Sequence, residues 1–221
     1  MIVNYYINGI AFTTFGVKVS GSKGLLNGLK IKEPLKVTWP DQHGEVVDLA
    51  APRYEAREIT LECFIKAASS TAFILAVQTF LAAFQKAGLQ RLMIDVNDAV
   101  ETRKPLLYEV YMAEGPDITK KWNATLMIGT FTLTLQEPEP VKCVYKFVPA
   151  TGAMTVTFTI TTTDPVNIYY GDGSNHLDVV TASGQKSHTY TTEGTFYIII
   201  TGVIENITAV TTTGTQVWSR L

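Results

Sequence analysis

Charge, paired cysteines and long hydrophobic runs are all scarce in this sequence of 221 residues. Charged residues make up 17% of the chain, the net charge is −2, and the lysines and arginines are scattered. Because nucleic-acid binding needs a basic stripe, we expect no nucleic-acid partner. The longest apolar stretch, residues 72–84, is too short to cross a bilayer, and residues 1–10 lack the features of a signal peptide. We therefore expect no membrane partner and synthesis in the cytoplasm.

Motifs for catalysis or metal binding are also missing. The two cysteines, Cys63 and Cys143, lie far apart in alternating runs and are expected to be reduced, buried apolar residues rather than a disulfide. None of His43, His176 and His188 has a neighbour at metal-ligand spacing, and no P-loop, G-x-S-x-G or G-x-G-x-x-G occurs. The sequence thus predicts no enzyme and no catalytic, cofactor or metal site. It does not identify interface residues.

Asp172, Asn175 and Asp178 offer the one cluster of oxygen ligands that suggests calcium. Their spacing does not fit the EF-hand loop, and Asp-Gly pairs commonly form turns. We favour a turn, with calcium as the alternative.

The hydrophobic share of 46% is enough to build cores, and its patterning indicates a mainly β protein with one helix. Residues 137–140 read Glu-Pro-Glu-Pro, which cannot continue a sheet ladder and favours a stiff, extended connector. We predict two domains, residues 1–138 and 139–221.

The first domain is predicted to be a β-sandwich or barrel-like fold. In Arg57–Lys66 the residues Ile59, Leu61, Cys63 and Ile65 face one way, and Phe64 is the exception among the outward residues. We expect further strands at Leu29–Trp39, Leu106–Met112 and Ala124–Leu135, with a bulge at Gly129. The first 28 residues are rich in glycine, but the glycines do not occur in the order of a phosphate-binding loop. We therefore favour an irregular loop there.

The single helix is predicted over about residues 70–87. Ser69, Ser70 or Thr71 caps its start, and Gly88 suits the left-handed position after its end. One face is apolar, and the opposite face has a single charge. We expect that second face to be covered either by another subunit or domain, or by loops of its own domain. The apolar face comprises Phe73, Val77, Phe80, Leu81 and Phe84, and the opposite face comprises Leu75, Gln78, Thr79, Ala82 and Lys86.

The second domain reads as a β-sandwich of short strands. Met154–Thr162 alternates strictly, Thr195–Thr201 resembles a central strand, and Val217 and Trp218 fit a last strand. Between the first two lies the turn sequence of residues 170–175.

Several residues of the first domain follow a known order. These are Trp39-Pro40, Gly44, Asp48, Tyr54, the run Arg57–Leu61, and the helix 70–87 with Gly88. In the order of these residues, residues 1–138 resemble the N-terminal domain of siphophage distal tail proteins (the phage tail family). That resemblance implies a hexameric ring at the tail tip, which joins the tail tube to the baseplate or adhesion device. The family's usual second domain is galectin-like, and residues 139–221 do not look so.

A second order occurs in residues 139–221. Tyr170-Gly171-Asp172-Gly173-Ser174 precedes His188-Thr189-Tyr190, and then Gly194-Thr195-Phe196 begins an apolar run. This part is similar to PKD immunoglobulin-like modules, which implies a spacer or adhesive domain. The hydroxyl of Tyr190 is placed to fix a corner of such a sandwich.

Together these features predict a structural component of the tail tip or baseplate of a phage or prophage virion. We expect a homo-oligomer, a hexameric ring by the family resemblance, that contacts other tail proteins, with the PKD-like domain binding a protein or a host glycan. The alternative is a non-catalytic binding module of a cell surface or secretion apparatus that recognises carbohydrate or protein.

Overall fold

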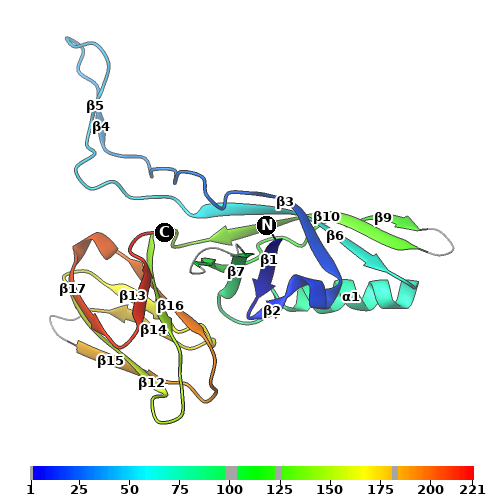
Figure 1. Ribbon diagram of the computed structural model, residues 1–221. Coiled ribbons are helices and arrows are strands. Elements are labelled where there is room, and N and C mark those ends of the chain that lie inside the picture. Colours follow the sequence, from blue (N-terminus) through cyan, green and yellow to red (C-terminus); the bar gives the residue numbers. More distant parts are fainter. Residues whose placement is uncertain (1, 98–103, 123–125, 181–183) are drawn as a thin grey trace.

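The structure is a computed structural model that describes residues 2–97, 104–122, 126–180 and 184–221. It is mainly β with one α-helix, as predicted. Figure 1 shows a body that carries the helix, a sandwich beside it, and a long arm that projects from the body.

Two four-stranded sheets and the helix form the body. In the first sheet the order is β2 (Ile10–Ala11), β1 (Ile2–Ile7), β7 (Gln90–Asn97) and β8 (Leu106–Val110). In the second it is β3 (Val17–Lys23), β6 (Arg57–Ala67), β10 (Met127–Glu137) and β9 (Thr119–Trp122). A short 3-10 helix, η1 (Phe12–Phe15), and α1 (Ser70–Ala82) pack against them.

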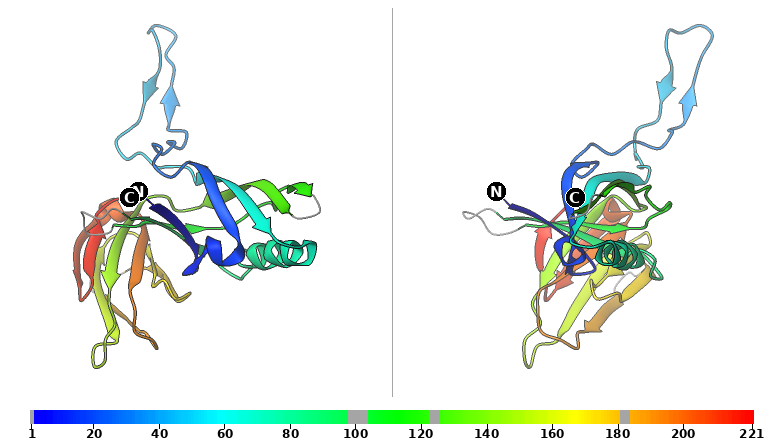
Figure 2. Two further views of the ribbon diagram at one scale, coloured as in Figure 1. Left: turned by 45° about the vertical axis from the view of Figure 1, so that its right-hand side comes forward. Right: turned by 90° about the vertical axis from the view of Figure 1, so that its right-hand side faces the viewer.

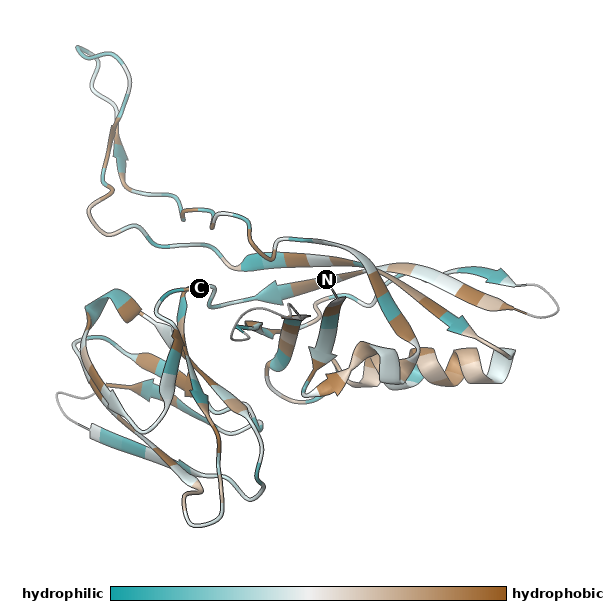
Figure 3. Cartoon of the chain, in the orientation of Figure 1, coloured by the Kyte–Doolittle hydropathy of each residue, from teal (hydrophilic) through white to brown (hydrophobic). Residues whose placement is uncertain are grey.

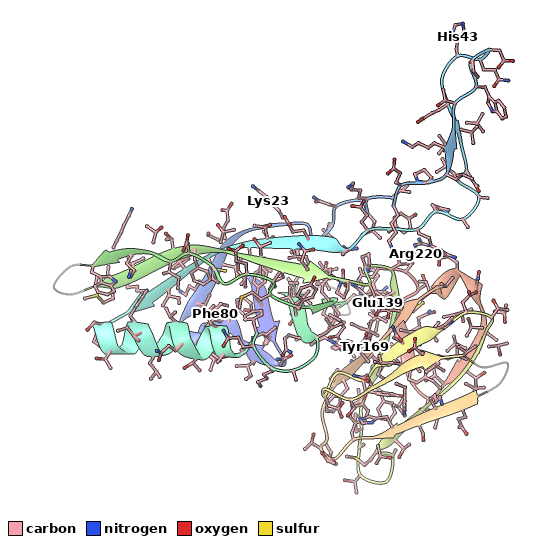
Figure 4. The ribbon with its side chains drawn as sticks, turned by 180° about the vertical axis from the view of Figure 1, so that it is seen from behind. Lys23, His43, Phe80, Glu139, Tyr169 and Arg220 are labelled. Carbon is pink, nitrogen blue, oxygen red and sulfur yellow. The ribbon has the colours of Figure 1, made fainter. Side chains whose placement is uncertain are left out.

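The core of the body is organised around Phe80, which is fully buried between α1 and the sheets (Figure 4). Its ring lies 5.0 Å from that of Phe12, 5.2 Å from Phe84, 5.7 Å from Phe15 and 5.9 Å from Phe131. The predicted apolar face of the helix is therefore confirmed. The predicted inward face of β6 is confirmed too, because Ile59, Leu61, Cys63 and Ile65 are all buried.

The helix is shorter than predicted. Ser69 caps it, with its hydroxyl accepting from Ala72 N at 3.2 Å, but it ends at Ala82 rather than at residue 87. Bonds from Ala83 N, Phe84 N and Gln85 N each reach back three residues and tighten the chain into turns. The Gln90 amide then donates to the carbonyls of Lys86 and Gly88, which satisfies acceptors after the helix end.

Gly129 does not form a bulge. Strands β6 and β10 stay in one continuous register from Met127–Ala67 to Glu137–Arg57. A side chain at Gly129 would collide with Phe73 Cζ at 2.6 Å and with Ile118 Cγ2 at 2.9 Å. The shift of apolar phase that suggested a bulge reflects this close approach of the helix to the sheet.

The predicted buried strand at Leu29–Trp39 is also wrong. These residues lie in the projecting arm, where only β4 (Lys36–Val37) pairs with β5 (Val46–Val47) and Ile31 bridges to Tyr54. Their apolar side chains are mostly exposed, so the alternation does not mark a face of this chain's own core.

Residues 142–218 form a two-sheet sandwich, as expected. One sheet has the order β14 (Asn175–Val179), β13 (Val166–Tyr169), β16 (Phe196–Gly202), β11 (Lys142–Phe147) and β18 (Thr215–Trp218). The other has β15 (Gly184–Thr189), β12 (Thr155–Thr162) and β17 (Ile207–Thr212), and η2 (Ile204–Asn206) precedes β17. The predicted central strand β16, last strand β18 and alternation of β12 are confirmed.

The corner contact expected of Tyr190 is present. Its hydroxyl donates to the Tyr170 carbonyl at 2.9 Å, and its ring stacks on Phe196 at 4.1 Å. In the described part of the chain no helix combines the length and the apolar character needed to cross a membrane.

Candidate functional site

The arm, residues 24–56, projects from the body in both views of Figure 2. Figure 3 shows hydrophobic residues along it, with no covering element beside them. Trp39 is 53% exposed and Leu35 is 73% exposed. A folded chain gains little from large apolar side chains in water, and a contiguous exposed set marks an interaction surface. The exposed apolar residues of the arm are Leu26, Ile31, Leu35, Val37, Trp39, Val46 and Leu49.

The distal part of the arm is acidic. Over residues 36–48 one lysine, Lys36, stands against the carboxylates of Asp41, Glu45 and Asp48, which gives a net charge of −2. Lys36 Nζ lies 3.6 Å from Glu45 Oε1, and His43 marks the tip in Figure 4. The arm therefore presents apolar side chains together with negative charge.

Backbone bonds and ion pairs hold the proximal part of the arm. Lys32 N donates to Arg53 O and Glu55 N to Lys30 O, each at 2.8 Å. Lys30 Nζ lies 2.7 Å from Glu55 Oε2. The two limbs of the arm are thus joined near the body.

The arm's first residues are fixed by a buried contact. Leu25 O accepts from Tyr108 OH at 2.8 Å and from Arg57 Nη1 at 3.2 Å. Gly24 has a φ of +83°, and a Cβ there would lie 2.0 Å from Glu58 O. Only glycine permits this approach to β6, so the direction in which the arm leaves the body is set by packing.

A buried ionic cluster lies behind that contact. Lys142 Nζ meets Glu137 Oε1, Arg57 Nε lies 3.4 Å from Glu137 Oε2, and Lys142 Nζ sits 4.4 Å from the centre of the Tyr108 ring. Lys142 is 0% exposed and Glu137 is 1% exposed. Burial lowers the pKa of Lys142 to about 8 although Glu137 opposes the shift, and burial raises the pKa of Glu137. The cluster links the arm to the start of β11.

The sandwich braces the other limb of the arm. Glu205 lies between Arg53 and Arg220, with oxygens 3.6 Å and 3.1 Å from their guanidinium nitrogens. Arg220 also lies 5.8 Å from the centre of the Tyr54 ring. Because these groups are half exposed, each pair contributes little energy, and together they position the arm.

The connector between body and sandwich is held by Glu139. Its carboxylate accepts from Asn167 Nδ2 at 2.7 Å, Thr201 Oγ1 at 2.7 Å and Tyr169 OH at 3.0 Å (Figure 4). These three bonds fasten the connector to the sandwich sheet.

Further contacts join the two halves. Arg91 pairs with Glu109 and donates to the carbonyls of Tyr197 and Tyr169, and Trp218 Nε1 donates to Pro105 O at 3.0 Å. Leu107, Val144 and Ile199 pack together between them.

The histidines and carboxylates near the Asp-Gly turn form local contacts. His188 Nε2 lies 2.7 Å from Asp172 Oδ2, and His176 Nδ1 lies 2.9 Å from Tyr170 OH. Burial by itself would raise the pKa of Asp172, but bonds from Ser174 N and His188 hold it below its ordinary value. Within the described residues no three His, Cys, Asp or Glu side chains gather at one point. This arrangement fits the turn that the Asp-Gly sequence favoured.

The cysteines differ from each other. Cys63 is buried as expected, and burial raises the pKa of its thiol to about 12. Cys143 is only half-buried and its thiol donates to Ser219 O at 3.0 Å, so the expectation of full burial is wrong for it.

Sequence reasoning did not identify the arm as a functional element. The signal was present in Gly24, Gly28, Pro34, Pro40 and Pro52, which punctuate the segment and disfavour a continuous strand. The glycines predict an irregular loop, whereas the alternation of residues 29–39 predicts a strand, and the structure has the loop.

No family model matches this chain, and no curated protein matches it either. Among solved structures, it is similar to the Dit protein (gp 19.1) of phage SPP1, described as a paradigm of the hub adsorption apparatus in phages that infect Gram-positive bacteria. The match has a TM-score of 0.48 and 9% sequence identity, and covers 90% of this chain and 98% of that chain.

Proposed function

We propose that this chain is a structural subunit of a phage tail tip, which self-assembles into a ring through its arm. The exposed apolar surface of the arm carries this proposal. Trp39, Pro40, Gly44, Asp48 and Tyr54, on which the resemblance to distal tail proteins partly rests, all lie in the arm. A surface of this kind is stable in water when a partner covers it.

A ring follows if the arm of one copy binds a different surface on the next copy. An arm that binds a different surface on the next copy makes a head-to-tail interface, and successive head-to-tail contacts close into a ring when the rotation permits. The family resemblance gives six copies. The assembled ring would belong to the virion tail, between the tail tube and the adhesion parts.

We further propose that residues 1–138 and 139–221 are two domains, and that the second, PKD-like domain contacts a neighbouring tail protein or a host glycan. The uncharged outer face of β12 and β15 supports a contact role. There Thr155 pairs with Thr189, Thr157 with Ser187, and Thr159 with Gln185. An array of glycans probed with the intact protein tests the glycan part. Absence of binding to every glycan would leave a tail protein as the partner.

Solution mass tests the ring. The intact chain should give a single closed oligomer, six copies by the resemblance, in native mass spectrometry and light scattering. The matched variant replaces residues 33–52 with Asn-Gly, because Lys32 and Arg53 are already bonded across the arm and suit a two-residue turn. That variant should keep its sheet content and be monomeric. An intact chain that stays monomeric at its highest soluble concentration contradicts the proposal.

A further inference from the structure

The outer face of the second sheet, away from α1, contains an apolar spot. On β6 the outward positions are polar except Phe64, the exception to the alternation. Phe64 pairs with Lys18 on β3 and with Thr130 on β10, and Thr130 pairs with Thr119 on β9. Residues that pair across antiparallel strands point to the same face, so these four side chains form one row.

The next row has the same character. Ile128 on β10 pairs with Lys66 on β6 and with Lys121 on β9. Phe64 and Ile128 are half-buried, whereas Lys66 and Lys121 are exposed. Phe64 and Ile128 are thus diagonal neighbours on this face, with Lys18 paired to the first and Lys66 and Lys121 paired to the second.

A hollow of about 440 Å³ lies on this face. Phe64 and Ile128 line it together with Ser20, Thr119 and Thr130. Glu62 and Asp117 also line it, and Lys66 and Lys121 lie outside the lining, beside Ile128, with which each of them pairs. A concave apolar spot with a polar rim is the form of a pocket that takes one anchoring side chain.

Resting on the proposed ring, we propose that this hollow receives Trp39 from the arm of a second copy, with Asp41 beside Lys66 and Lys121. The partner is complementary in two respects. Trp39 is the largest exposed apolar side chain of the arm, and the part of the arm around it carries the net charge of −2. Large aromatic anchors near opposite charge dominate many interfaces.

The chain's own arm is not the occupant. It leaves the body at Lys23 and Arg57, the end of β6 opposite Lys66, and points away from β9 in Figures 1 and 2. Residues 24–39, when extended, reach about 50 Å at roughly 3.3 Å per residue. That reach exceeds the radius of gyration of a domain of 100 residues, about 13 Å, so the arm can extend to a second copy.

Cross-linking between two populations, each with one accessible cysteine, tests the contact. One population carries Gln42→Cys and the other Thr130→Cys, both in a Cys143→Ser background with the buried Cys63 kept. Mixed and treated with a short thiol-reactive linker, they should give a dimer that joins one chain of each kind. In the control, Thr157→Cys on the sandwich replaces Thr130→Cys and should give at least ~10-fold less product.

Charge reversal provides the second test, because adjacent lysines of β9 point to opposite faces. Lys121 pairs with Ile128 on the outer face, and Lys120 pairs with Gly129 on the helix side. Lys121→Glu should raise the concentration needed for assembly by ~10-fold or more, Lys120→Glu should have little effect, and Asp41→Lys should restore assembly of Lys121→Glu.

The outcomes separate the two proposals. An oligomer that forms without the Gln42–Thr130 cross-link, and that responds equally to Lys120→Glu and Lys121→Glu, overturns the docking site and leaves the ring intact. A chain that never oligomerises overturns both. Cross-linking together with selective loss on Lys121→Glu supports the docking site.

Discussion

Substitution of Gly24 by alanine should destabilise the protein because the arm begins in a conformation that only glycine tolerates. Gly24 has a φ of +83°, and its added Cβ would lie 2.0 Å from Glu58 O, 3.0 Å from Glu58 C and 3.1 Å from Ile59 Cα. All three are backbone atoms of β6, which is paired on both sides and cannot retreat cheaply.

Two other glycines of the arm allow the cost of the left-handed backbone to be separated from the cost of the collision with β6. Gly44 also has a φ of +83° but meets nothing within 4 Å, so Gly44→Ala isolates the cost of the left-handed backbone, about 1–2 kcal/mol. A Cβ at Gly28 meets nothing, so Gly28→Ala should be neutral or slightly stabilising. Gly24→Ala adds the backbone collision, which brings the expected loss to about 3 kcal/mol or more.

Thermal unfolding measures these differences. For a chain of this size each kcal/mol shifts Tm by about 2–4 °C, so Gly24→Ala should lower Tm by roughly 6–12 °C. Gly44→Ala should have a smaller effect and Gly28→Ala almost none. If Gly24→Ala unfolds at the temperature of Gly28→Ala, the arm does not pass this close to β6 and the described exit is incorrect.

Three further predictions concern the buried residues. Phe80→Ala should cost about 3–5 kcal/mol in urea unfolding because four rings surround the lost side chain, whereas Leu75→Ala on the exposed face should cost under about 0.5 kcal/mol; equal losses would contradict the packing. Tyr190→Phe leaves the Tyr170 carbonyl without its buried donor and should cost about 1–3 kcal/mol by calorimetry, and an unchanged Tm would refute that bond. Above about pH 8 folded Lys142 loses its proton while the unfolded chain keeps one up to the ordinary lysine pKa, so stability relative to Lys142→Met should rise with pH over this window by roughly 3 kcal/mol. Urea titrations from pH 7 to pH 10 measure this difference, and a flat curve would contradict the buried ammonium.

The sequence predicts an element correctly where a single segment of the chain buries one of its own faces. The alternation of β6 and β12, the Ser69 cap and the turn at residues 170–175 are local patterns, and each predicted element is present. The helix ends earlier than its apolar spacing predicts because the bonds of Ala83, Phe84 and Gln85 switch to reaching back three residues, a change that the spacing does not report. Gly129 was misjudged because Phe73, which occupies the space above it, comes from another element.

The arm was misread for a deeper reason. Hydrophobic alternation reports that a surface is to be covered, but not which chain covers it. Two features do not fit a domain that covers all of its own apolar residues. Residues 29–39 hold more apolar side chains than this chain buries there, and Phe64 is apolar at an outward position of β6. In the structure these two features become a projecting apolar arm and a half-buried hollow on the outer face of the second sheet.

The residues that hold the arm come from four separated parts of the chain, which explains why no motif announced them. Leu25 is fixed by Arg57 and Tyr108, behind them Glu137 meets Lys142 of β11, and the other limb is braced through Arg53 by Glu205. Since β11 and Glu205 belong to the sandwich, the direction of the arm depends on both halves. A change at the sandwich that displaces Lys142 or Glu205 is therefore transmitted to the arm, so the proposed contacts of residues 139–221 with other proteins and the proposed assembly of the ring should be energetically coupled.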